Sequence, residues 1–203
     1  MGVSARATVE TLALMAGVFL VQLLLMPLFV AIGIPVFHIP GSIAKLLLAP
    51  WTWVVSVYAH GGPMHLVGNA LILVPFGLAV EQVTSRFRFH AFFVTVGAVA
   101  GLSQVLFTKI VPLMPARGVL GASGAILALV GYAIAGNRVS DQLVGAFELD
   151  ARAQLAALAA VGAAIALWLA GPGVANIGHF TGLILGLLAG RARLLHVDSS
   201  AGV

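Results

Sequence analysis

Two short segments combine a potentially reactive side chain with small neighbours inside otherwise apolar sequence. Ser123 lies in the tetrapeptide GASG, and His179 lies in the pentapeptide GHFTG. A serine hydroxyl becomes an effective nucleophile when a base takes its proton, and histidine suits this task because its pKa lies near neutrality. If two helices bring these residues to one depth, they form a nucleophile and its general base.

A third segment places polar groups at the start of another apolar stretch. It reads HGGPMHLVGN and contains His60, His65 and Asn69. His65 and Asn69 are four residues apart, so they share one face of a helix, and Pro63 suits a first helical turn. An imidazole N–H and an amide on one face can stabilise the negative oxygen of a tetrahedral intermediate. The three segments together predict one hydrolytic site.

The composition places these residues in a membrane protein. The chain is 61% hydrophobic and 8% charged, with a mean hydropathy of +1.13, whereas soluble domains carry about 25% charged residues. The net charge of +4 reflects scarce acids and scattered bases, which argues against nucleic-acid binding. The absence of cysteine excludes a thiol nucleophile, a disulfide and a Cys-ligated metal. With no long hydrophilic stretch, we expect residues 1–203 to form a single membrane domain.

Six stretches are suited to cross a bilayer, which takes about 20 mainly apolar residues each. The uncharged run 153–190 is too long for one span, and the Gly-Pro-Gly at 171–173 divides it. The first stretch has no clear cleavage site and is long for a signal peptide, which favours a retained helix. The sequence predicts an all-α membrane protein with helices over residues 11–34, 63–81, 89–108, 119–136, 153–170 and 174–193.

The distribution of Lys and Arg predicts the orientation. One side of the expected bundle carries seven bases and the opposite side three: Arg6, Arg86, Arg88, Arg138, Arg152, Arg191 and Arg193 against Lys45, Lys109 and Arg117. This bias predicts a multi-pass protein of the cell membrane with both termini in the cytoplasm. The polar residues of the candidate site then lie less than about 10 Å below the outer rim, where water can enter.

The remaining patterns concern how the helices are positioned. The first loop, residues 35–62, is rich in Trp and Tyr with one charge, which favours a position along the outer membrane interface. Small residues repeat every four positions in the last span, and this spacing lets membrane helices approach closely. The glycines concerned are Gly178, Gly182, Gly186 and Gly190, and Gly121 and Gly124 keep the facing helix equally slim.

The three motifs, in this order on the second, fourth and sixth helices, resemble the rhomboid intramembrane serine proteases of the bacterial and archaeal type. The resemblance covers roughly residues 50–190 and implies a six-helix rhomboid-like bundle with an interfacial first loop. It implies that Ser123 is the nucleophile and His179 the general base, without a carboxylate. It also implies that the backbone N–H of Ser123, with His65 and Asn69, stabilises the oxyanion. Structural support would come from His60, Glu81, Gly121, Gly124, Gly182 and Gly186.

The same resemblance implies an activity and its partners. Such an enzyme cleaves transmembrane segments of other membrane proteins near their extracytoplasmic end, through an acyl-enzyme and with small residues at the cut. It works in the lipid bilayer and uses no metal or cofactor; by analogy, helix 153–170 would gate substrate entry. The chain departs from the family pattern at three positions, none of which removes a reacting group: Thr52 in place of Arg, Leu127 in place of an aromatic residue, and Gly178 in place of Ala.

These residues also admit four other interpretations. His60, His65 and His179 as a metal site would lack a nearby carboxylate or thiolate, and their spacing is not that of HExxH zinc proteases. A small transporter would need an ion-coupling charge within the spans, and none is present. A packing serine bonded to its own helix is the plain alternative for Ser123. An inactive rhomboid-like protein that binds membrane clients is the remaining alternative. We assign no function to His38, His90 and His196.

Overall fold

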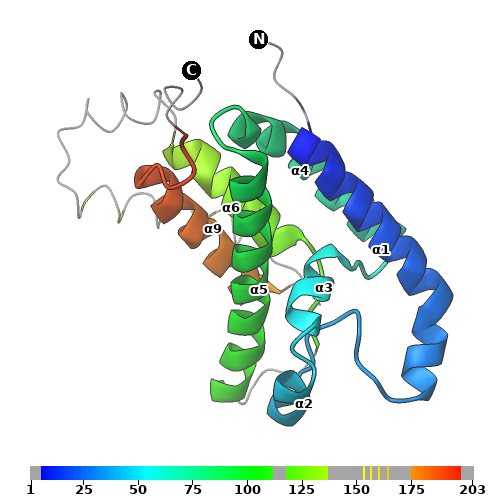
Figure 1. The fold of residues 1–203 in the computed structure, drawn as a ribbon. Coiled ribbons are helices and arrows are strands. Elements are labelled where there is room, and N and C mark those ends of the chain that lie inside the picture. The colour runs from blue at the N-terminus through cyan, green and yellow to red at the C-terminus, as the bar shows by residue number, and fades with distance from the viewer. Residues whose placement is uncertain are drawn as a thin grey trace.

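The computed structural model describes residues 6–111, 118–136 and 175–197, together with single alanines at 153, 156, 160 and 164. Within these ranges seven helices are present, and the sole β pairing is an isolated bridge between Ile39 and Val119. The helices are α1 (Arg6–Ala31), α2 (Ile43–Leu48), α3 (Thr52–Tyr58), α4 (Pro63–Glu81), α5 (Arg86–Ile110), α6 (Ser123–Ala135) and α9 (Asn176–Arg191) (Figure 1). The predicted all-α membrane fold is confirmed. The expected span 153–170 lies outside the described residues, apart from the four alanines.

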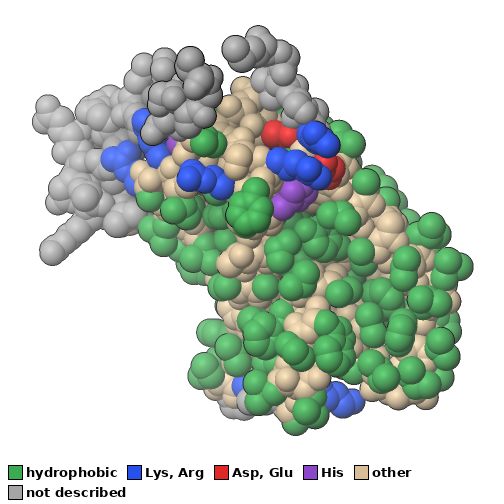
Figure 2. Space-filling view, in the orientation of Figure 1, with side chains coloured by type: hydrophobic (Ala, Val, Ile, Leu, Met, Phe, Trp, Pro, Cys, Tyr) green, Lys and Arg blue, Asp and Glu red, His purple; other side chains and the backbone are tan. Residues whose placement is uncertain are grey.

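The surface and the helix lengths both fit a lipid environment. Of the described helices, α1, α4 and α5 are long and apolar enough to cross a membrane, with hydropathies of 2.4, 1.7 and 1.8, and α6 is a shorter apolar helix. Apolar side chains cover most of the face seen in Figure 2, and charged side chains gather mainly at one end of it. Helices satisfy their own backbone groups, which is what a hydrocarbon solvent requires.

Helices α6 and α9 form the centre of the bundle, with α5 and α4 packed beside α6 and α1 at the outside (Figure 1). The pair packs closely because glycines replace side chains between the two backbones. A Cβ added to Gly182 would meet the backbone of Gly124, and one added to Gly186 would meet the backbone of Ala128. The small-residue stripe of α9 therefore faces α6, so the backbones approach within the reach of short side chains.

The stretch before Ser123 differs from the expected helix. Helix α6 begins at Ser123 rather than at 119, because residues 118–122 run along the first loop. Val119 and Ile39 exchange two backbone hydrogen bonds of 2.7 and 3.0 Å, and the Gly121 N–H donates to the Ser56 carbonyl at 2.9 Å. Gly121 has a φ of +124°, which glycine adopts readily and which helical continuation does not allow.

The first loop is a folded element with the short helices α2 and α3 rather than an irregular connection. Its side chains Phe37, Ile39 and Tyr58 are buried, whereas Trp51 is 46% exposed. Helix α3 packs directly on α5, where Gly97 leaves room for the Val57 side chain. Since the loop also bonds the stretch before Ser123, it fixes where α6 starts.

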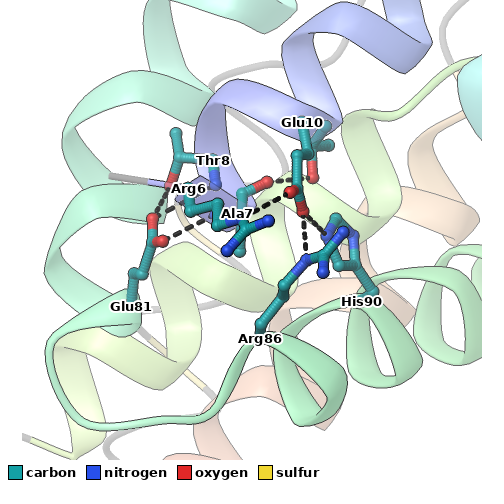
Figure 3. Close-up of polar contacts among 8 residues, drawn as sticks. Arg6, Ala7, Thr8, Glu10, Glu81, Arg86 and His90 are labelled. Atoms are coloured by element: carbon teal, nitrogen blue, oxygen red, sulfur yellow. Dashed lines mark hydrogen bonds and ion pairs between the residues drawn. The ribbon is translucent and has the colours of Figure 1, made fainter. Parts of the chain in front are cut away.

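One end of the bundle is fastened by two carboxylates (Figure 3). Glu81, at the end of α4, accepts from the Ala7 N–H at 2.6 Å and from the Thr8 N–H and hydroxyl at 3.1 and 2.8 Å. It caps the first turn of α1, where N–H groups have no intrahelical acceptor. Glu10 of α1 bonds Arg86 and His90 of α5 at 2.7 and 2.9 Å. Three helix ends are thereby held together.

Candidate active site

The Ser123 hydroxyl and the His179 imidazole form a hydrogen bond across the two central helices. Ser123 Oγ and His179 Nε2 are 2.7 Å apart. Ser123 is the first residue of α6, and His179 lies in the first turn of α9. His179 Nδ1 is buried, and it has no hydrogen-bond partner among the described residues. At this distance the hydroxyl can donate to Nε2 when the imidazole carries its single proton on Nδ1, and no carboxylate of the described residues bonds Nδ1.

Three helices approach one another at the level of this pair. A Cβ on Gly124 would lie 2.6 Å from the Ala100 Cβ of α5, and one on Gly178 would lie 2.9 Å from the Ala100 carbonyl oxygen. Side chains larger than hydrogen at 124 or 178 would separate the helices. The hydroxyl and the imidazole come within hydrogen-bonding distance because the residues around them are small.

Polar residues of α4 lie on the other side of Ser123. A Cβ placed on Gly121 would lie 3.1 Å from His65 Nε2 and 3.8 Å from Ser123 Oγ, so both groups border this glycine. The opposite nitrogen, His65 Nδ1, accepts from the Gly61 N–H at 3.3 Å. Asn69, one turn further along α4, is buried, and its Nδ2 has no partner among the described residues. Its N–H groups are available to a ligand.

His60 lies behind His65 rather than beside Ser123. Its side chain is fully buried, its Nδ1 lies 2.9 Å from the Tyr58 carbonyl oxygen, and its ring meets that of His65 edge-on with centroids 5.2 Å apart. Burial, together with the neighbouring His65, lowers the pKa of His60 to about 4. His60 is therefore neutral at physiological pH and shapes the turn before α4.

Comparison with known proteins identifies the family. The sequence model described as the Rhomboid domain matches residues 48–195, well over half of the chain. The chain belongs to the rhomboid family. It is 26% identical over 166 residues to RHOMBOID-like protein 5 of Arabidopsis thaliana, covering 80% of this chain and 51% of that protein. It is 28% identical over 150 residues to RHOMBOID-like protein 6, mitochondrial, of the same plant, covering 73% and 45%. It is 30% identical over 82 residues to Rhomboid-related protein 2 of Mus musculus, covering 40% and 25%.

The rhomboid chain spans about half the length of the plant relatives it matches. Helix α1 lies ahead of the matched range but is bonded to it at two places: Glu81 caps its first turn, and Gln22 bonds the backbone of His60. The part of the candidate site around His60 is therefore held in place by α1, which lies outside the matched region.

The structure gives a reason for two of the departures from the family pattern. Gly178 is required because a Cβ there would press on the Ala100 carbonyl oxygen. Thr52 is fully buried and donates from Oγ1 to the Ala49 carbonyl oxygen at 2.6 Å, which joins α2 to α3. Leu127 is buried in an apolar cluster with Leu183 and Leu187. It therefore contributes to the packing between α6 and α9 but does not provide an aromatic ring.

Two glutamines that the sequence analysis passed over position the site. Gln104 of α5 accepts, through Oε1, from the N–H groups of Ile177 and Gly178 at 2.9 and 3.2 Å. It caps the start of α9, which has no side-chain cap of its own. Gln22 bonds the peptide groups of His60. The sequence does contain a signal for these residues: each is an isolated amide in an apolar span, and such a group is costly in lipid unless it has a hydrogen-bond partner.

Within the described ranges, no three His, Asp or Glu side chains gather in a metal-binding arrangement. Of the three histidines in the candidate site, His179 contacts Ser123, whereas His60 and His65 share an edge-on contact. What the arrangement offers chemically is a hydroxyl with a base, next to N–H donors.

Proposed function

We propose that this rhomboid is an intramembrane serine endopeptidase. The observation that carries the proposal is the 2.7 Å contact between Ser123 Oγ and His179 Nε2 in the interior of an apolar bundle. A serine with only a packing role would bond a carbonyl of its own helix, whereas this hydroxyl is directed at an imidazole 56 residues away.

In the proposed acylation step, Ser123 Oγ attacks the carbonyl carbon of the scissile peptide bond while His179 Nε2 takes the hydroxyl proton. The tetrahedral intermediate collapses when the C–N bond breaks, and the imidazolium gives its proton to the leaving amine. The acyl-enzyme ester on Ser123 remains. In deacylation, water attacks the carbonyl carbon of this ester while His179 accepts the water proton. The bond between the acyl carbon and Ser123 Oγ then breaks, the imidazolium returns the proton to Ser123 Oγ, and the carboxylic acid product leaves.

Three donors are suited to the oxyanion of both intermediates. The Ser123 N–H stands at the first position of α6, where helical N–H groups have no intrahelical acceptor. His65 Nε2 borders Gly121 beside the nucleophile, and the buried Asn69 Nδ2 has no partner among the described residues. Removal of one preorganised donor typically costs about 10²–10³ in rate.

The substrates proposed for this site are transmembrane segments of other membrane proteins, cleaved near their extracytoplasmic end with small residues at the cut. The apolar exterior suits a protein embedded in the lipid where such segments lie (Figure 2). The preference for small residues at the cut is what the resemblance to rhomboid proteases implies. No metal or cofactor enters this mechanism.

The proposal includes an orientation and a domain. We place both termini in the cytoplasm of a cell-membrane protein, with residues 50–190 as the core of a single domain. In support, the ion-paired cluster of Arg6, Glu10, Arg86 and His90 lies at the end of the bundle opposite to α2, the helix that carries Lys45 (Figures 1 and 3). Because the chain has no cysteine, a single cysteine introduced in place of Arg88 or of Gly41 is the one thiol that a membrane-impermeant reagent can label. We expect the reagent to label position 41, and not position 88, from outside the cell. Labelling of the position-88 thiol from outside the cell would contradict this orientation.

The activity is tested with a fluorophosphonate probe and a model single-span substrate. We expect the wild type to be labelled and to cut, and Ser123→Ala to do neither. Ser85→Ala, at the start of α5 and remote from His179, is the matched control and should retain both properties. Labelling of Ser123→Ala would indicate another nucleophile. A folded wild type that neither reacts nor cuts would favour the client-binding interpretation.

A further inference from the structure

Gln22 is an unusual residue in its helix. Between Leu12 and Ala31, α1 carries no other polar side chain. Gln22 is nevertheless 6% exposed, so its amide faces the protein rather than lipid. A buried amide is tolerated when its donor and acceptor are both satisfied. Its partners therefore indicate what it is for.

Both halves of the Gln22 amide bond one residue, His60. Gln22 Nε2 donates to the His60 carbonyl oxygen at 2.8 Å, and Gln22 Oε1 accepts from the His60 N–H at 3.1 Å, both buried. The second Nε2 hydrogen faces Met26 Sδ at 3.9 Å. This two-point contact fixes the peptide groups on either side of the His60 Cα, immediately before the Gly61-Gly62 turn into α4.

The His60–Gly61 peptide group, whose carbonyl oxygen Gln22 holds, determines which nitrogen of His65 carries the proton. The Gly61 N–H donates to His65 Nδ1 at 3.3 Å, so this nitrogen must be the acceptor. In a neutral imidazole the other nitrogen then carries the hydrogen. That nitrogen, Nε2, borders Gly121 and Ser123. The alternative tautomer would turn a lone pair, instead of an N–H, toward a developing negative oxygen.

We propose that Gln22 is a positioning residue for the oxyanion donor His65. By holding both peptide groups of His60, it directs the Gly61 N–H at His65 Nδ1 and keeps His65 in the tautomer that donates from Nε2. This inference rests on the proposed protease function. It assigns a catalytic contribution to a residue of α1, ahead of the matched rhomboid domain.

The first test replaces the amide by an apolar side chain of similar size. Gln22→Leu should lower kcat on a model transmembrane substrate by about 10–100-fold, as loss of a supporting contact behind a functional ligand does, and should leave KM unchanged. In a His65→Ala background, the same substitution should have no further effect, because the group that it positions is gone. Additive losses in the double variant would overturn the proposal.

The second test makes the contact switchable. In Gln22→Glu a protonated carboxyl can still donate to the His60 carbonyl oxygen and accept from its N–H, whereas a carboxylate can only accept. We expect wild-type kcat at low pH and a fall to the Gln22→Leu level as the carboxyl ionises. His60, His65 and Tyr58 are unchanged in this variant, so the added pH step belongs to position 22. Gln82→Glu, at an exposed site after α4, should keep the wild-type profile.

The outcomes separate this inference from the proposed function. If the wild type cuts and Gln22→Glu follows the wild-type pH profile, the positioning role is wrong and the protease stands. If the folded wild type does not cut at all, the proposed function fails. If Gln22→Leu does not fold, the Gln22→Glu profile decides alone: a variant that stays slow at low pH overturns the proposal.

Discussion

The contact between α6 and α9 makes Gly182→Ala the sharpest single perturbation of the site. A Cβ at position 182 would meet backbone atoms of Gly124, which cannot rotate away as a side chain can. Overpacking of this kind costs about 1–3 kcal/mol, and the gain in helix propensity from Gly to Ala offsets about 1 kcal/mol. We therefore expect a net loss in unfolding free energy of up to about 2 kcal/mol.

The effect on catalysis should be larger than the effect on stability. Position 182 lies one turn after His179, so helices that separate there also separate the 2.7 Å Ser123–His179 contact. A displacement of about 1 Å at a reacting centre typically costs on the order of 10²-fold in rate. The assay is kcat on a model transmembrane substrate, together with Tm in detergent.

Two other glycines serve as controls. Gly17→Ala in α1 meets no atom within 4 Å, so it should keep full activity and gain stability from helix propensity alone. Gly186→Ala meets the backbone of Ala128 and should lose as much stability as Gly182→Ala but less activity, because it lies further from His179. Wild-type kcat in Gly182→Ala, or equal damage in Gly17→Ala, would show that the helix separation does not control the hydrogen bond.

Three further predictions concern groups that hold the site from outside. Glu81→Gln should lower the unfolding free energy by about 1–2 kcal/mol through loss of the charged cap on α1, measured as a lower Tm, while exposed Gln82→Ala leaves Tm unchanged. Gln104→Leu should lower kcat because the first N–H groups of α9 lose their acceptor. Gln104→Glu keeps an acceptor oxygen and should retain part of the rate. Equal rates in the two variants would contradict the capping role. Because burial lowers the pKa of His60 from 6.5 to about 4, the folded state binds this proton less readily than the unfolded state. Stability should fall as the pH drops from 6.5 toward 4, and His60→Gln should remove part of that fall in urea titrations at each pH.

The sequence was sufficient for the features that follow from local pattern. Low charge and long apolar runs determine a lipid environment, because such a chain cannot cover itself with polar surface. A four-residue interval puts His65 and Asn69 on one face whatever lies around them. The repeat of Gly182 and Gly186 predicted a close helix neighbour, and the structure identifies it as α6. Family membership followed from the motif order and is established by the match over residues 48–195.

The tertiary structure alone decided which distant groups meet. Gln22 and His60 are 38 residues apart, and Gln104 and Ile177 are 73 apart; hydrophobic periodicity is identical whether or not such pairs form. The start of α6 at Ser123 likewise depends on the pairing of Val119 with Ile39 and of Gly121 with Ser56. Local propensity acts over one or two helical turns, whereas a buried polar group is satisfied by whatever the folded chain brings to it. The sequence therefore identified the candidate reacting side chains, and the packing of α1, α5 and the first loop determined how they are oriented.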